Sequence, residues 1–302
     1  MTDLYLLILR RKLSTGCDSI IIRNAVAAGQ FYPRSSGDIE SMLDKFSRRA
    51  SADQRDVLGA VTPHAGYMYC GETQAHVYGS LLEDLNTFVI LGPNHTNTGA
   101  SEAIMTSGMW KTPMGNARID SELANSILEN SEYLEDDYNA HNQEHSIEVQ
   151  LPWLQRKYGT FNFVPISMSE QSLRKGQDIG EAIRDAKDDV DEKFVVLASS
   201  DFTHFGVSYG YRPVSGGINK KLNYIEKVDK EAAAAVEKLS PETFMDVVER
   251  YDTTICGTGP IVALLYYLKD EGSSGELIDY STSYEVSKNE NSIVGYCAIV
   301  LE

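Results

Sequence analysis

The stretch VTPHAGYMYCGETQAHVYGSLLEDLNTFVILGPNH, residues Val61–His95, predicts a strand, a helix and a second strand. Two apolar runs, Val57–Val61 and Phe88–Leu91, are bounded by glycine and proline and are separated by a segment of helical length. This pattern is typical of a parallel βαβ unit. Each run leads directly to a histidine, His64 or His95, so both imidazoles should leave the carboxyl ends of neighbouring strands, where open α/β sheets bind their ligands.

These two histidines allow two interpretations. Neutral imidazoles that converge on one point would supply half of a site for a divalent metal ion. Alternatively, both are loop residues that hydrogen-bond to nearby backbone. The stretch itself favours neither interpretation. If the histidines bind a metal ion, the remaining ligands must come from other loops.

Length and charge exclude several classes of protein. The chain has 302 residues, of which 42% are hydrophobic and 24% are charged, and its formal net charge is −17. This length suits one large domain or two small ones. The sequence contains no repeat, low-complexity linker or break in composition, so a single domain is expected. The negative charge and the lack of a basic cluster argue against nucleic-acid binding.

Cysteine spacing and the N-terminal segment predict a cytoplasmic protein. The four cysteines are widely scattered and form no CxxC pair, which argues against a disulfide framework and fits a reducing compartment. The apolar run near the start, Leu4–Leu9, is much shorter than the ~20 residues that span a bilayer. Its basic cluster, Arg10–Lys12, follows the apolar run, opposite to the order in a signal peptide. No membrane association is predicted.

Two further loops carry reactive side chains. The run Val195–Ala198 is followed by Asp201 and His204, which suits an acid/base histidine oriented by a carboxylate or hydroxyl. The alternative is a turn in which Asp201 caps the next element. Cys256 lies shortly before Pro260, which suits the first turn of an apolar helix. A thiol there should have a lowered pKa and serve as a metal ligand or nucleophile, whereas the alternative is a small buried hydrophobe.

The segment HNQEHSIE, from His141 to Glu148, contains two histidines four residues apart. It differs from the zinc-protease motif HExxH, because the glutamate does not directly follow the first histidine. We interpret His141 as a surface residue. Glu144 and His145 are assigned to the lining of a substrate pocket.

With these segments identified, the chain resembles the Memo family (mediator of cell motility), including the Memo-like part of AmmeMemoRadiSam proteins. Matching segments follow one another in the family's order from Arg23 almost to the end of the chain. They are AVAAGQFYP, PHAGYMYCG, VILGPNH, WKTPMGNARID, EHSIEVQLPWL, SSDFTHFG, TTICGTGP and NSIVGYCAIVL. Residues 1–22 lie outside the resemblance as an N-terminal extension, and residues 23–302 are expected to form one Memo-like α/β domain.

The resemblance implies a fold and a set of site residues. The family is similar in fold to the class III extradiol dioxygenases, so we expect a three-layer α/β/α sandwich around a mixed central sheet. Carried over by position, the family's metal-site residues fall on His64, His95 and Cys256. Asp201 and His204 match the loop beside that site. The implied cofactor is a divalent or soft metal ion, iron foremost, with copper and zinc as alternatives.

The resemblance implies a function less directly than it implies a fold. Non-haem iron oxygenases generally use two histidines and a carboxylate, whereas Cys256 takes the third position here, so dioxygenase activity does not transfer with the fold. Our first hypothesis is a metal-dependent oxidoreductase that acts on an unidentified small substrate, with His204 as acid/base and Asp201 orienting it. One alternative is a metal-free hydrolase or transferase with Cys256 as nucleophile. Another is a non-catalytic module that binds a peptide or protein in the same cleft; the resemblance implies AMMECR-type and radical-SAM proteins as partners.

Overall fold

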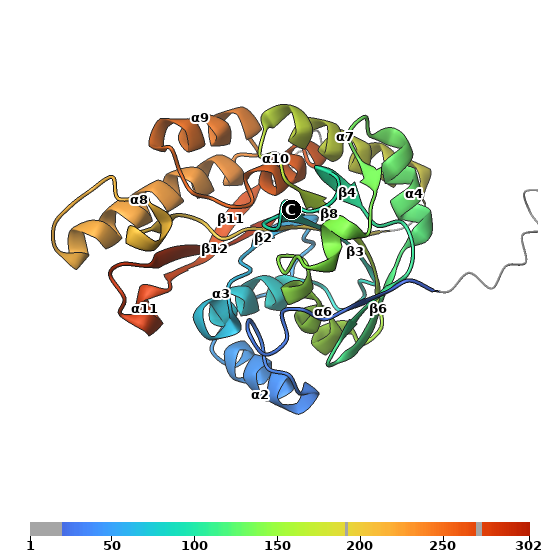
Figure 1. The fold of residues 1–302 in the computed structure, drawn as a ribbon, viewed down its shortest axis with the longest axis horizontal. Coiled ribbons are helices and arrows are strands. Elements are labelled where there is room, and N and C mark those ends of the chain that lie inside the picture. Colours follow the sequence, from blue (N-terminus) through green and yellow to red (C-terminus); the bar gives the residue numbers. More distant parts are fainter. Residues whose placement is uncertain (1–19, 191–192, 270–273) are drawn as a thin grey trace, which may run out of the picture.

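The structure of the chain is a computed structural model, which describes residues 20–190, 193–269 and 274–302. Within these ranges the centre of the molecule is a 12-stranded mixed sheet with helices packed on both faces (Figure 1). This arrangement confirms the predicted three-layer α/β/α architecture. Most of the predicted N-terminal extension, residues 1–19, lies outside the described residues. The division into that extension and one domain stays a prediction.

The sheet is parallel at its centre. Its main path in space is β1 (Ile22–Asn24), β5 (Met109–Thr112), β6 (Gly115–Ile119), β8 (Asn162–Met168), β3 (Thr87–Pro93), β9 (Val195–Ser199), β2 (Gly59–Thr62), β12 (Ile293–Leu301) and β10 (His204–Phe205). Off this path, β11 (Gly275–Thr282) pairs with β12, and β4 (Glu102–Ile104) joins β8 to β7 (Glu135–Asp136). Because β8, β3, β9 and β2 are parallel, their carboxyl ends share one edge.

Two helical layers cover the sheet (Figure 1). One layer contains α4 (Ser121–Asn130), α7 (Leu173–Asp189), α8 (Ile218–Glu237), α9 (Pro241–Tyr251) and α10 (Thr258–Tyr267). The other contains α2 (Ser36–Ser47), α3 (Tyr67–Ser80) and α6 (Leu151–Tyr158). Shorter elements are α5 (Asn139–Asn142), α11 (Tyr284–Ser287) and the 3₁₀ helices η1 (Glu148–Gln150) and η2 (Val207–Tyr209). In the described ranges, no helix combines the length and the apolar character that crossing a bilayer requires.

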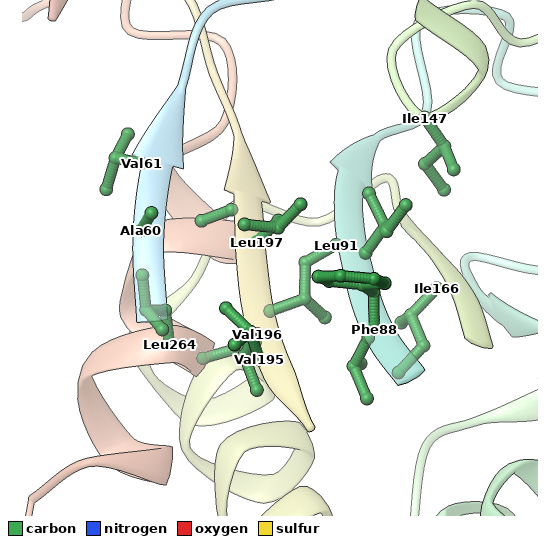
Figure 2. Close-up of a cluster of buried hydrophobic side chains, with 14 of the residues drawn as sticks. Ala60, Val61, Phe88, Leu91, Ile147, Ile166, Val195, Val196, Leu197 and Leu264 are labelled. Carbon is green, nitrogen blue, oxygen red and sulfur yellow. The ribbon is translucent and has the colours of Figure 1, made fainter. Parts of the chain in front are cut away.

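The apolar runs of the sequence form the buried centre of the sheet. Every residue of β2, β3 and β9 is buried, because helices cover both faces and remove the usual alternation of apolar and polar side chains. Figure 2 shows Val61, Leu91 and Leu197 on these strands, together with Leu264 of α10. This packed core fixes the positions at which the strands end and the loops of the site begin.

The predicted βαβ unit is present, but its strand order needs a correction. β2, α3 and β3 follow one another in the chain, yet both strands pair with β9, which lies between them. The prediction that His64 and His95 leave neighbouring strands is therefore wrong. Because the crossover through α3 skips one strand position, the end of β9 lies between the two histidine loops and brings Ser199 and Asp201 to the same edge.

Candidate metal centre

Three segments that are distant in sequence meet at the carboxyl edge of the parallel strands. His64 follows β2, His95 follows β3, and Cys256 precedes α10. One ligand atom from each of these residues lies within 4.8 Å of the other two. The Nε2 atom of His64 is 3.2 Å from the Sγ atom of Cys256. The structure thus brings together the three residues that the resemblance implies as metal ligands.

His64 is buried, and its tautomer is determined by Ser199. The Ser199 hydroxyl donates its proton to the carbonyl of Ser146 at 2.7 Å, since a carbonyl can only accept. Ser199 must then accept from Nδ1 of His64 at 3.1 Å, as it does from the amide of Gln150 at 2.8 Å. His64 therefore carries its proton on Nδ1 and presents the Nε2 lone pair to Cys256. Burial, with the neighbouring imidazoles, lowers the pKa of His64 well below its ordinary value and keeps the ring neutral.

His95 is oriented in the same way by a buried carboxylate. Glu144 accepts from Nδ1 of His95 at 3.0 Å and from the backbone N–H of His95 at 2.5 Å. Burial alone would raise the pKa of Glu144, but hydrogen bonds from His95 and Ser146 and the nearby imidazoles outweigh it and hold that pKa well below its usual range. An ionised carboxylate can only accept, so His95 carries its proton on Nδ1 and leaves Nε2 available.

Cys256 differs from the expectation for a thiol at a helix N-terminus. α10 begins at Thr258 with Gly257 as its N-cap, so Cys256 lies just outside the first turn. Burial and the nearby Asp201 carboxylate raise the pKa of the thiol. The predicted shift toward thiolate is therefore wrong for the protein chain alone, because lost solvation outweighs the helix dipole. As a thiol, Cys256 can donate to the Nε2 lone pair of His64.

The donor set fits a single metal ion. Tetrahedral zinc sites have metal–sulfur distances of about 2.3 Å and metal–nitrogen distances of about 2.0–2.1 Å, which place the two donor atoms about 3.5 Å apart. The 3.2 Å between His64 Nε2 and Cys256 Sγ is close to that separation. Both His64 and His95 have their second nitrogen held by a protein acceptor, as metal-bound histidines generally do. Two imidazoles and a thiolate suit iron, copper or zinc and not magnesium or calcium.

His145 forms a wall beside these three residues. Its ring stacks on Phe31, with 4.2 Å between centroids, and on His95, with 4.8 Å between centroids. Its Nδ1 atom lies 3.3 Å from Glu144 Oε1. The Glu144 side chain is fully buried and does not border the cavity, whereas His145 does. Of the two residues assigned to the substrate pocket, His145 faces it and Glu144 supports the histidines.

Asp201 and His204 both border the cavity, but they are not paired as predicted. Nδ1 of His204 donates to the carbonyls of Phe202 and Thr254 at 2.9 and 3.0 Å. Oδ1 of Asp201 accepts from the backbone N–H groups of His64 and the following residue at 2.8 and 3.2 Å. The prediction that Asp201 orients His204 is therefore wrong. Backbone carbonyls orient the imidazole, which keeps Nε2 as its proton acceptor, and Asp201 anchors the loop of His64.

A cavity of about 430 Å³ adjoins the candidate ligands. Imidazoles form one part of its wall, and the remainder is formed largely by aromatic rings and hydroxyl groups, including those of Tyr69, Tyr209, Tyr296, Ser283 and Ser287. In the part of the chain that the structure describes, no lysine or arginine borders it. Its size and mixed lining are typical of a site for a small molecule.

Sequence reasoning missed a buried ion pair behind the site. Arg23 on β1 pairs with Glu148, and both side chains are fully buried. Arg23 also donates to the carbonyls of His141 and Glu144 at 3.1 and 2.5 Å. The pair therefore ties β1 to the segment that holds His95. In the sequence, the sign of this buried pair is that Glu148 lies among the apolar residues of its segment.

The interpretation of His141 as a surface residue is wrong. Its side chain is fully buried and makes an edge contact with Trp110, with 5.7 Å between ring centroids. Burial and the nearby charge of Arg23 lower the pKa of His141 to about 3. The polar sequence around His141 suggests a surface loop, but the segment is buried, and Arg23 binds both the carbonyl of His141 and the side chain of Glu148.

The family model and the curated relatives identify the same family. The family model described as Memo-like protein matches residues 23–300. A MEMO1 family protein of Methanopyrus kandleri is 39% identical over 291 residues, which cover 92% of this chain and 98% of that protein. A MEMO1 family protein of Pyrococcus abyssi is 38% identical over 290 residues, which cover 93% and 99%. Among solved structures, an uncharacterized protein of Escherichia coli K12 is similar at 11% identity with a TM-score of 0.44, covering 81% of this chain and 100% of that one.

Proposed function

Because the chain belongs to the Memo-like family, we propose that it uses the family's pocket as a metal-dependent redox enzyme that acts on a small molecule. His64, His95 and Cys256 hold the metal ion, and the substrate binds in the adjoining cavity. The observation that carries the proposal is the convergence of one ligand atom from each of two imidazoles and one sulfur beside a cavity of suitable size.

The ligand types narrow the choice of metal. A thiolate with two imidazoles favours iron, copper(I) or zinc. Iron and copper change oxidation state and zinc does not, so the redox proposal names iron first and copper second. When bound, the metal would supply Lewis-acid and electron-transfer chemistry at the cavity wall.

The remaining roles belong to side chains of this chain. His204 is the proposed acid/base, because its Nδ1 proton is held by two carbonyls and its Nε2 atom can take a proton from a substrate hydroxyl or amine. Asp201 keeps the loop of His64 in place through two backbone N–H groups. The stacked rings of His145 and Phe31 offer a flat surface against which a planar substrate can pack.

Metal content tests the site. Protein purified without a histidine tag should retain a stoichiometric amount of iron or copper, and His64→Ala should lose most of it. His76→Ala is the matched control, because His76 lies on α3 and its Nδ1 atom hydrogen-bonds to the carbonyl of Ser51 at 3.0 Å. Equal metal content in His64→Ala and the unmodified chain would exclude the proposed metal site.

Redox function needs a separate measurement. Protein loaded anaerobically with Fe(II) and then exposed to dioxygen should develop an Fe(III) signal in electron paramagnetic resonance, and ascorbate should remove that signal. A site that takes up zinc alone, or iron that does not change oxidation state, argues against a redox enzyme while leaving the metal site intact.

Two other functions have unequal support. A non-catalytic binding module is favoured by the exposed rings of Tyr69 and Tyr209 at the cavity, 37% and 40% exposed. In that case an AMMECR-type or radical-SAM partner should bind equally to the unmodified chain and to a His95→Ala/Cys256→Ala variant. A metal-free hydrolase or transferase has less support, because the raised pKa of Cys256 leaves little thiolate at neutral pH.

A further inference from the structure

Asp229 is a buried carboxylate that has no part in the roles described above. It lies on the face of α8 that packs against β11 and β12 (Figure 1), and its side chain is fully buried. In the described part of the chain, no ion pair links Asp229 to a lysine or arginine. Burial raises the pKa of Asp229 to about 6, although hydrogen bonds from Thr203 and Tyr280 act in the opposite direction. A carboxylate at such a position is costly to bury, so its hydrogen bonds call for an explanation.

Two hydrogen bonds fix the carboxylate of Asp229. Oδ1 accepts from the backbone N–H of Thr203 at 3.0 Å, and Oδ2 accepts from the hydroxyl of Tyr280 on β11 at 3.0 Å. The backbone of Gly295 on β12 passes so close that a Cβ atom at this position would overlap Oδ2. The absence of a side chain at Gly295 therefore leaves the space in which the carboxylate lies.

Thr203 belongs to the loop that carries the proposed acid/base. This loop runs from the end of β9 to His204, and the N–H of Thr203 is accepted by a side chain, that of Asp229, instead of a neighbouring strand. The carbonyl of the same peptide unit, which belongs to Phe202, accepts from Nδ1 of His204 at 2.9 Å. The N–H and C=O groups of a trans peptide point in opposite directions, and the described residues contain no cis peptide. With its N–H held by Asp229, this peptide therefore directs its carbonyl toward the imidazole.

We propose that Asp229 is a positioning residue, which orients the Phe202–Thr203 peptide and through it the imidazole of His204. With Nδ1 held as a donor, Nε2 of His204 remains the proton acceptor beside the cavity. This inference rests on the proposed function in one respect, because the acid/base role of His204 gives the orientation its use. The orientation itself is a property of the metal-free chain.

Thr254 makes a separate contribution to the same histidine. Its carbonyl also accepts from Nδ1 of His204, at 3.0 Å, and its hydroxyl accepts from the backbone N–H of His204 at 2.7 Å. These contacts come from the loop before α10 and do not involve Asp229. Loss of Asp229 should therefore free one of the two carbonyls that hold the Nδ1 proton and leave the other in place.

The tautomer of His204 tests the proposal. Heteronuclear NMR of metal-free, histidine-labelled protein at alkaline pH distinguishes a protonated Nδ1 atom from an unprotonated one, and His204→Gln identifies the signal. The unmodified chain should carry the proton on Nδ1. Asp229→Ala should lower the ratio of the Nδ1–H to the Nε2–H tautomer about fivefold, the effect of one lost hydrogen bond. An unchanged ratio would overturn the proposal.

Asp229→Asn is the conservative variant. Its side-chain oxygen can still accept from Thr203 and its amide can donate to the hydroxyl of Tyr280, so the tautomer ratio should be retained. The raised pKa means that ionised Asp229 destabilises the folded chain above about pH 6, so Asp229→Asn should unfold at the same or a higher temperature at neutral pH. If asparagine lowered the ratio as much as alanine does, the acceptor would not be what orients the peptide, and the proposal would be wrong.

Two further variants separate positioning from a general loss of packing. Asp229→Leu keeps the branched shape without an acceptor, so it should give the same fivefold change even if Asp229→Ala does not fold. Glu102→Ala is the matched control, because Glu102 is a buried carboxylate that accepts from the backbone N–H of Glu170 at 3.1 Å. It lies on β4, which pairs with β8, and β3, β9, β2 and β12 separate β8 from β10. A change in the His204 tautomer in Glu102→Ala equal to that in Asp229→Ala would overturn the proposal.

These measurements separate the positioning role from the metal proposal, since all of them use metal-free protein. If the unmodified chain retained no metal, the metal proposal would fail and the tautomer result would stand. Normal metal content together with an unchanged tautomer in Asp229→Ala would remove the positioning role alone.

Discussion

The histidine side and the cysteine side of the candidate metal centre are prepared for a ligand in opposite ways. His64 and His95 hold their protons on Nδ1 against Ser199 and Glu144, so their Nε2 lone pairs are available. Cys256 keeps its proton, because burial and a nearby carboxylate raise the pKa of the thiol. A metal ion would therefore have to displace a proton from sulfur but none from His64, whose pKa is lowered by burial.

This difference separates two properties of the site. The imidazoles, fixed by buried partners, would determine where an ion is held. The thiol determines which ions are preferred, since sulfur favours soft metals, and it links their affinity to pH. Substituting a histidine and substituting the cysteine should therefore change metal affinity, metal preference and pH dependence differently.

Removing a ligand should have the largest effect. Structural zinc sites bind with roughly 10–16 kcal/mol shared among four ligands, so Cys256→Ser and His95→Ala should each weaken zinc binding roughly 100- to 1,000-fold. Competition with a chromophoric chelator measures both affinities, with His76→Ala as the control. Cys256→Ser should also reduce the preference for copper(I) over zinc, whereas His95→Ala should not. If both variants changed the preference for copper(I) over zinc equally, the proposed difference between the cysteine and the histidines would be wrong.

The pH dependence of metal affinity should come next in size. Because the pKa of Cys256 is raised, the thiol is protonated near neutrality, and raising the pH removes the proton that competes with the metal. Zinc affinity should then rise about tenfold per pH unit between about pH 6 and pH 8, or about 100-fold in total. Cys256→Ser should flatten this dependence. A hundredfold rise in zinc affinity per pH unit would mean that two protons are released. An imidazole would then also lose a proton, which contradicts the neutral state inferred for His64.

Changing the hydrogen-bond acceptor behind a histidine should lower metal affinity less than removing a ligand does. Glu144→Gln keeps a hydrogen-bond acceptor but removes the charge behind His95, so metal affinity should fall about 10- to 100-fold. Ser199→Ala, which removes a neutral acceptor behind His64, should have a smaller effect. Zinc titration gives the affinities, the visible spectrum of cobalt-loaded protein reports ligand geometry, and circular dichroism checks the fold. Unchanged affinity in Glu144→Gln would mean that the carboxylate serves the fold alone.

The sequence was most informative where local pattern determines structure. The apolar runs before His64 and His95 predict β2 and β3, because buried parallel strands consist of continuous apolar residues bounded by turn residues. Since strands of one βαβ unit are parallel, the two histidines were expected at one edge of the sheet, and they lie there. The position of β9 between them depends on the order in which strands assemble, which no local pattern records.

The sequence was misleading where long-range burial determines the environment. His141 lies in a polar segment, but Arg23 and Glu148, 125 positions apart, form a buried pair that draws it inside. The pKa of Cys256 was expected to fall because of the adjacent helix, yet burial by other loops raises it. Both errors have the same cause, since desolvation is set by residues that are distant in sequence.

The smallest effect should be seen in the reactivity of Cys256, which tests the cysteine side directly. Cys256 is partly exposed, so a small reagent can reach it. Its raised pKa reduces the thiolate fraction, and the greater nucleophilicity of a thiolate of higher pKa offsets this only in part, so chelator-treated protein should react with iodoacetamide more slowly than glutathione at neutral pH. Asp201→Asn should speed the reaction, because it removes a carboxylate that disfavours the thiolate, and zinc should block it. Rapid alkylation that zinc does not prevent would show that the sulfur is poised as a nucleophile, and the metal-free hydrolase would then be the better assignment.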